Sequence, residues 1–154
     1  MVGFVLTDAE RRFLTELEAR GVKYMVVGLT AAALQGANTT TVDIDLWFET
    51  TADTRIQDAA NAAGGLWVSG FGMMPARLGG LLGDRFDVVL HMSGLGRFEE
   101  EFARARAMTV EGVPIRVLPL DRILVSKRAA NRPKDLASIP ALEEALATID
   151  ESES

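Results

Sequence analysis

Hydrophobic residues alternate with polar ones in some stretches of the chain and recur every three or four residues in others. Thr7 and Glu10 form the pattern of a helix capping box, and the apolar stripe that follows ends at Gly21, so a helix is expected between them. Further helices are expected at 31–35, 51–63, within 93–106, at 119–125 and at 141–149, and strands at 22–27, 42–49, 66–69, 85–91, 108–110 and 113–118. This mixture predicts an α/β (α+β) fold, with a mixed, twisted β-sheet and helices packed mostly on one face, in a single domain over residues 1–154.

Three connecting segments carry separate predictions. Thr50 or Thr51 is expected to cap the helix that ends before Gly64. Residues 70–83 are rich in glycine and methionine and are expected to be irregular or mobile beside a functional site. Their methionines are expected to fill a gap in the core, although contact with a substrate base is the alternative. Residues 150–154 are expected to form a frayed acidic tail.

The strand predicted at 42–49 combines an apolar face with two carboxylates. Its even-numbered residues are all apolar, whereas the opposite face begins with Asp43 and Asp45. Residues two positions apart in a strand lie on the same side, roughly 6.5 Å apart. Carboxylate oxygens at this spacing can converge on Mg²⁺ or Mn²⁺. The alternative interpretation is a solvated strand face without a ligand.

Composition restricts the class of protein. The chain has 154 residues, of which 48% are hydrophobic and 25% charged, as is typical of a soluble globular domain. It has no cysteine, which excludes disulfides and is compatible with a cytoplasmic location. No apolar run approaches the ~20 residues that span a bilayer, and no signal peptide is expected. The formal charge of −6 argues against nucleic-acid binding over the whole surface but leaves room for a local basic patch.

Such a patch is present near the C-terminus. Four cationic residues fall within an eight-residue stretch, namely Lys127, Arg128, Arg132 and Lys134. A solvated basic loop is the default interpretation of a charge run of this kind. The functional interpretation is a surface that neutralises a triphosphate. Pro133 is expected in a turn or at the first position of another helix.

Together these motifs resemble the nucleotidyltransferase superfamily with the polymerase-β-type fold, near the abortive-infection toxin branch and its uncharacterised bacterial relatives. The family has an apolar strand, a small-residue turn, a short helix and a T-x-D-h-D strand, where h is apolar. The corresponding segments here are YMVVG, Gly28-Leu29-Thr30, AAALQG and TTVDIDLWF. Leu29 stands where Gly or Ser is usual, and Thr30 offers a hydroxyl one position later. The basic stretch of that branch is matched by Arg128, Arg132, Lys134 and Asp135, while Ser138 replaces a common acidic residue.

The resemblance implies a catalytic site for NTP-dependent transfer. Asp43 and Asp45 would hold two Mg²⁺ or Mn²⁺ ions. A third carboxylate is expected on a neighbouring strand; Asp87 is the main candidate and Asp84 the alternative. Asp87 would share one ion and take the acceptor proton, unless it is instead a strand-edge residue paired with Arg85 or another cation. Nucleotide-binding residues are expected in the turn and the basic stretch, namely Gly28, Leu29, Thr30, Lys127, Arg128, Arg132 and Lys134.

The implied function is transfer of a nucleoside monophosphate from an NTP, such as ATP, to a hydroxyl acceptor. The acceptor would be tRNA or another RNA, a protein or a small molecule. The family also suggests the toxin of a toxin–antitoxin pair, with a cognate antitoxin as partner. His91, the sole histidine, is expected to be structural rather than in contact with substrate. Two other classes stay open: a non-catalytic nucleotide-binding or regulatory relative, motivated by Leu29, and a D-x-D glycosyltransferase.

Overall fold

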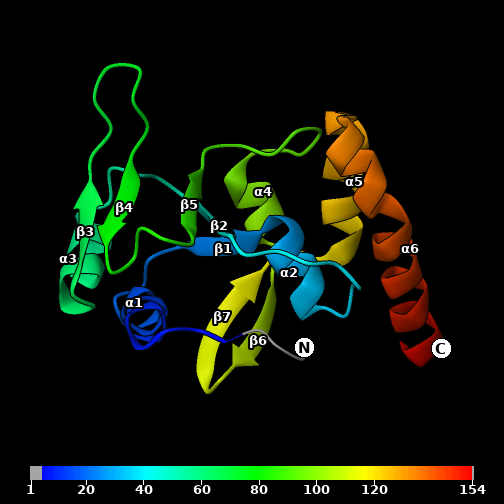
Figure 1. Cartoon of the computed structure of the whole chain (residues 1–154), viewed down its shortest axis with the longest axis horizontal. Coiled ribbons are helices and arrows are strands. Elements are labelled where there is room, and N and C mark those ends of the chain that lie inside the picture. The colour runs from blue at the N-terminus through cyan, green and yellow to red at the C-terminus, as the bar shows by residue number, and fades with distance from the viewer. Residues whose placement is uncertain (1–4, 154) are drawn as a thin grey trace.

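The computed structural model describes residues 5–153 of the chain, and the side chains only as far as Glu151 (Figure 1). In chain order its elements are α1 (Asp8–Ala19), β1 (Tyr24–Val27), α2 (Gly28–Leu34), β2 (Ile44–Phe48), α3 (Thr54–Ala62), β3 (Gly65–Val68), β4 (Arg77–Gly80), β5 (Phe86–Val89), α4 (Phe98–Phe102), β6 (Arg106–Val110), β7 (Val113–Val117), α5 (Leu120–Ala130) and α6 (Pro133–Glu153). The predicted mixture of helices and strands is confirmed.

The main sheet is mixed, as predicted, with the strand order β5-β2-β1-β7-β6. Strand β2 runs antiparallel to β1 and parallel to β5, so the strand with the D-x-D motif has a neighbour on each side. Asp45 is paired in register with Val27 of β1 and with Asp87 of β5. The strands predicted at 108–110 and 113–118 are confirmed, and they pair as the hairpin of β6 and β7. Its turn contains Glu111 and Gly112, both with positive φ, as a tight hairpin turn requires.

The core covers both faces of the central strands, so the expectation of helices mostly on one face is wrong. All four residues of β1 are buried, and alternate residues of a strand point to opposite faces. Trp47 lies on the same face as Asp45, yet only 3% of it is exposed, and its ring packs edge-on against Phe98 of α4 at 5.6 Å. The open part of that face is therefore limited to the end of β2 that carries the aspartates.

Residues 70–83 were predicted to be irregular, but they contain a strand that belongs to a second, two-stranded sheet. Strand β4 pairs with β3, and the hairpin projects from the body of the protein (Figure 1). The glycine-rich sequence of β4 hides the strand signal, but Gly79 and Gly80 let the two backbones pair closely. Met73 and Met74 are exposed at the end of this hairpin, so the prediction that they fill the core is wrong.

Two helix boundaries also differ from the prediction. Asp53, rather than Thr50 or Thr51, caps α3, because its carboxylate accepts the backbone N–H of Arg55. Helix α6 begins at Pro133 and continues past Pro140 to Glu153, much longer than the expected 141–149.

Packing against α5 explains the long final helix. Helices α5 and α6 lie side by side (Figure 1), and Leu142 and Ala145 are buried. This burial offsets the hydrogen bond that a proline inside a helix removes. The predicted frayed tail is helical through Glu153, while Ser154 lies outside the described residues. Within residues 5–153, no helix combines the length and apolar character needed to cross a membrane.

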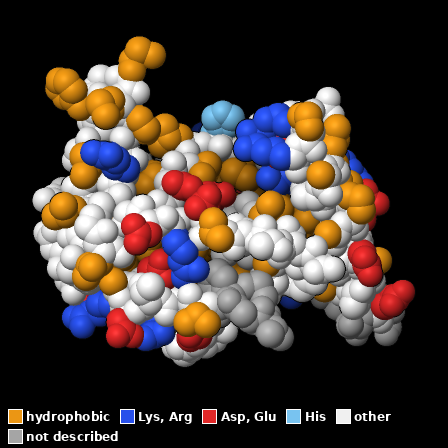
Figure 2. Space-filling view, in the orientation of Figure 1, with side chains coloured by type: hydrophobic (Ala, Val, Ile, Leu, Met, Phe, Trp, Pro, Cys, Tyr) orange, Lys and Arg blue, Asp and Glu red, His pale blue; other side chains and the backbone are white. Residues whose placement is uncertain are grey.

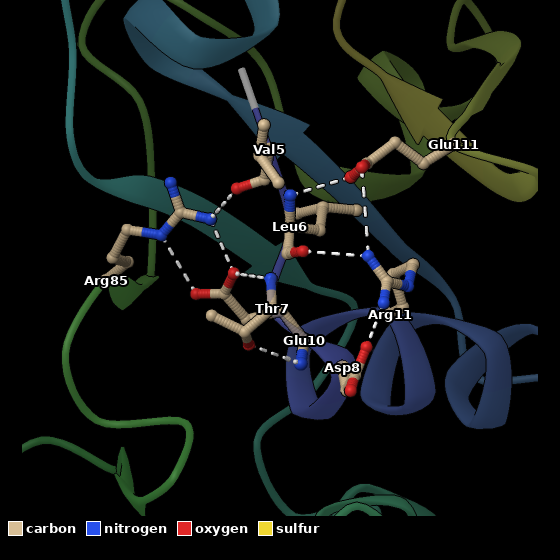
Figure 3. Close-up of polar contacts among 8 residues, drawn as sticks. All are labelled: Val5, Leu6, Thr7, Asp8, Glu10, Arg11, Arg85 and Glu111. Atoms are coloured by element: carbon tan, nitrogen blue, oxygen red, sulfur yellow. Dashed lines mark hydrogen bonds and ion pairs between the residues drawn. The ribbon is translucent and has the colours of Figure 1, made fainter. Parts of the chain in front are cut away.

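A polar network fixes the beginning of β5 to α1 (Figure 3). Thr7 and Glu10 form the predicted capping box. The Glu10 carboxylate is buried and accepts hydrogen bonds from Arg85, with 2.9 Å between Nε and Oε2. Arg85 also donates to the carbonyl of Val5, and Glu111 accepts the backbone N–H of Leu6. Arg85 directly precedes β5, so this network holds the strand that carries the third candidate carboxylate.

Candidate active site

The site is built around the Asp45 carboxylate, which lies directly against the backbone of Gly28. Gly28 begins α2 with a φ of +72°, a conformation that L-residues with side chains rarely adopt. A Cβ atom at this position would lie 2.5 Å from Oδ2 of Asp45. The glycine of the predicted turn is thus required twice, once for its backbone conformation and once for the space that Asp45 occupies.

Asp43, Asp45 and Asp87 interact electrostatically, as the predicted grouping requires. Burial raises the pKa of Asp45, and the charges of Asp87 and Asp43 raise it further, while Lys127 and Lys134 partly offset these effects. Partial burial and Asp43 likewise raise the pKa of Asp87. A carboxylate in a strand-edge ion pair would have a lowered pKa. The electrostatics of Asp87 therefore differ from those of the alternative in which Arg85 neutralises it.

The short helix α2 contributes differently from the expected phosphate-binding turn. Thr30 is 2% exposed, and its hydroxyl donates to the backbone carbonyl of Asp43. Thr41 donates to the same carbonyl at 3.2 Å. Leu29 is partly buried and packs against the core. In this structure Thr30 orders the segment before β2, and the part of the turn that reaches the cleft is Gly28.

The opposite side of the site is cationic. Lys127 lies in the last turn of α5, and Arg132 lies between α5 and α6. Both donate to the carboxylate of Asp135, with Nζ of Lys127 at 3.1 Å and Nε of Arg132 at 2.6 Å. Asp135 itself is fully buried. Two of the four residues of the basic stretch are therefore held in a defined arrangement rather than in a solvated loop.

The other two residues of the stretch lie elsewhere. Arg128 pairs with Glu143 of α6 at 3.0 Å, and both side chains are about half exposed. It does not line the cleft described below, so its assignment to nucleotide binding has no geometric support among the described residues. Lys134 is near enough to Asp45 for its positive charge to offset part of the rise in the pKa of that carboxyl.

A cleft of about 220 Å³ lies between Asp45 and the cations Lys127 and Arg132; Asp43 and Asp87 are not among the residues that line it. Figure 2 shows this face hollowed, with acidic side chains on its floor and Lys and Arg side chains toward α5 and α6. The cleft is lined by Gly28, Asp45, Val89, His91, Met92, Ser93, Ser126, Lys127, Ala130, Arg132 and Asp135. It is large enough for part of a nucleotide, with Asp45 at one side and Lys127 and Arg132, bonded to Asp135, at the other.

Several of these residues were missed or misjudged from the sequence. His91, expected to be structural, is exposed and lines the cleft together with Met92 and Ser93. Ser126 is a buried serine on α5, and no sequence signal distinguishes it from an ordinary helix residue. Asp84, the alternative third carboxylate, lies in an exposed turn before β5.

The three aspartates do not form a complete metal site by themselves. Among residues 5–153, no group of three or more His, Cys, Asp or Glu side chains is spaced to hold a metal ion. The available donors are nevertheless hard carboxylate oxygens, the kind that Mg²⁺ and Mn²⁺ prefer. Burial raises the pKa of Asp45 and of Asp87, and the charges of neighbouring aspartates raise it further; a bound cation would relieve this second, repulsive contribution.

The arrangement of sheet and helices is a nucleotidyltransferase-like fold, as predicted. Two solved structures, both of ANT(2″)-Ia, show this likeness. One is the crystal structure in complex with adenylyl-2″-tobramycin: the TM-score is 0.52 and the identity 15%, with 93% of this chain and 95% of that chain covered. The other is the solution structure, described as that of an antibiotic-resistance factor: the TM-score is 0.55 and the identity 15%, with 92% and 82% covered. No protein-family model and no curated protein matches the sequence.

Proposed function

We propose that the protein is a nucleotidyltransferase, which moves a nucleoside monophosphate from an NTP to a hydroxyl acceptor. The observation that carries the proposal is that Asp45 lines one cleft together with Lys127 and Arg132, while Asp87 is paired in register with Asp45 on the adjacent parallel strand. A triphosphate with its metal ion is complementary in charge to such a site, because the cation binds anionic ligands and the phosphates bind cationic groups. The likeness in fold to ANT(2″)-Ia agrees with this arrangement.

Asp43 and Asp45 are the residues that would hold Mg²⁺ or Mn²⁺. Both lie at the open end of β2, and the charge of Asp43 contributes to the raised pKa of Asp45. The triphosphate oxygens would complete a ligand set that the carboxylates alone leave incomplete. The bound metal would stabilise negative charge on the phosphates and acidify the acceptor hydroxyl.

Asp87 is the proposed proton acceptor. It is exposed toward solvent, on the strand next to Asp45, where an acceptor hydroxyl can approach. Burial and Asp43 raise its pKa, and a more basic carboxylate takes a proton more readily. General-base catalysis of this kind contributes typically ~10²–10⁴-fold to a rate.

Lys127 and Arg132 would bind the phosphates and offset the charge of the leaving pyrophosphate. Lys134 would add to the positive potential near Asp45. Gly28 would let the backbone approach the phosphates closely, since it carries no side chain. The sequence-based assignments of Leu29, Thr30 and Arg128 to nucleotide binding are set aside here, because these three residues do not line the cleft.

The direct test is incubation with each labelled NTP and Mg²⁺, in the presence of total RNA, a metabolite mixture including aminoglycosides, or a protein mixture. Transfer of label to one class identifies the acceptor and also tests the predicted RNA, protein and antitoxin partners. Binding of NTP without transfer in any mixture would favour the regulatory alternative, for which Leu29→Gly is the reverting variant. Failure to bind any NTP would refute the proposal.

A further inference from the structure

The most completely bonded charged group in the cleft is an acid, Asp135. Its carboxylate accepts hydrogen bonds from Lys127 Nζ at 3.1 Å, from Arg132 Nε at 2.6 Å and Nη2 at 3.2 Å, and from the Arg132 backbone N–H at 3.3 Å. Its own backbone carbonyl accepts the Ser138 hydroxyl at 2.7 Å. Arg132 and Lys127 outweigh the effect of burial and lower the pKa of Asp135 to about 2, so it is ionised at neutral pH.

This acid is a paradox for a phosphate-binding surface. Lys127, Arg132 and Asp135 together carry a formal charge of +1, where the two cations alone would carry +2. A negative charge within the cleft lining reduces the attraction for a polyanion. Charge by itself therefore gives no reason for an acid at this position, and its contribution must be geometric if it aids binding.

The geometry supplies that reason. Lys127 lies in the last turn of α5, Arg132 follows that helix, and Asp135 lies in the first turn of α6, so one carboxylate joins three consecutive segments. Lysine and arginine side chains lose considerable rotamer freedom when they bind a ligand. The Lys127 side chain is only 17% exposed and that of Arg132 58%, so without the carboxylate the arginine in particular could turn away into solvent.

We propose that Asp135 is a positioning residue for the nucleotide: it pre-orders Lys127 and Arg132 on the cleft wall facing Asp45, at the expense of part of their charge. This inference rests on the proposed function, because it assigns the triphosphate as the group these cations meet. Ordering a rotamer-rich side chain before binding removes a cost that would otherwise be met on binding. With two side chains released, the affinity for polyphosphate should fall by roughly 5- to 100-fold.

The decisive variant is Asp135→Asn, because the two explanations predict opposite signs. Removal of a negative charge from the cleft should tighten polyphosphate binding if charge alone matters, and should weaken it if positioning matters. Affinity for ATP with Mg²⁺ and for inorganic tripolyphosphate is measured by isothermal titration calorimetry, well below the melting temperature of each variant. Glu16→Gln is the matched control, since Glu16 also joins two arginines, Arg12 and Arg20, but on α1 outside the cleft lining. It should leave both affinities unchanged.

Asp135→Glu provides a second measurement if the asparagine variant unfolds. It keeps the charge and displaces the carboxylate, so positioning predicts an affinity between those of the wild type and a Lys127→Ala variant. An affinity equal to the wild type in Asp135→Glu, or unchanged or tighter binding in Asp135→Asn, would overturn the inference and leave the transferase proposal intact. Wild-type protein that binds tripolyphosphate but transfers nothing would remove the transferase proposal alone. Wild-type protein that binds neither ligand would overturn both.

Discussion

Replacement of Gly28 by alanine tests the site most directly, because the structure separates two costs at this position. The first is conformational: φ is +72°, and a side chain in the left-handed region costs about 1–2 kcal/mol. The second is steric: the new Cβ would lie 2.5 Å from Oδ2 of Asp45, closer than real Cβ contacts allow. The Asp45 carboxylate must then move away from its position beside Asp87, and metal–nucleotide binding should be lost with it.

Gly112→Ala is the control that carries only the first cost. Its φ is +80°, and no heavy atom lies within 4 Å of an added Cβ. Gly112→Ala should lose about 1–2 kcal/mol of folding free energy, which lowers the melting temperature by roughly 2–8 °C for a chain of this size, and Gly28→Ala should lose at least as much. Only Gly28→Ala should lose Mg²⁺–ATP binding in calorimetry. Normal ATP affinity in Gly28→Ala, or an equal loss of ATP affinity in both variants, would refute the proposed role of this glycine beside Asp45, the carboxylate that we propose to bind metal.

Three further predictions follow from the same contacts. Asp45→Asn should weaken Mg²⁺–ATP binding by at least the roughly 10-fold that loss of a supporting group costs a metal site. The raised pKa of Asp45 means that its ionisation destabilises the folded state. The Asp45→Asn variant should therefore have a higher melting temperature than wild type as the pH rises above 3.8, and the same melting temperature as wild type below that pH. Asp87→Asn should bind ATP normally and lose ~10²–10⁴-fold in transfer, whereas Asp84→Asn should be mild; the reverse result would transfer the role to Asp84. Glu10→Gln should cost roughly 1.5–3 kcal/mol in urea unfolding, because Arg85 loses its ionised partner; a change within ±0.5 kcal/mol would contradict that importance.

Local patterns in the sequence were sufficient for most of the elements and for the centre of the site. The capping box of Thr7 and Glu10 and the apolar even-numbered face of β2 are local signals, and the structure confirms the cap and the burial of that face. The D-x-D spacing placed Asp43 and Asp45 near each other because strand geometry has a period of two. The basic stretch could be read as a charge cluster, although its individual roles could not.

Only the tertiary structure decided which groups meet across the sheet and across the cleft. Strand register determines that Asp45 lies beside Asp87 and against Gly28, and register depends on packing between segments far apart in the chain. The same holds for α6, where burial against α5 overrides the proline inside the helix.

The basic stretch illustrates most clearly the difference between what the sequence determines and what tertiary packing decides. Its four cations have equal standing in the sequence, but the fold turns Arg128 outward to Glu143 and turns Lys127 and Arg132 toward Asp135. A helix directs successive side chains to different sides, so which side faces the cleft depends on how α5 and α6 pack against the sheet. The sequence by itself determined the residue types of the proposed site and their local spacing. The packing of distant segments decided which of these residues face one another, because that information lies in contacts between elements and not in any single stretch.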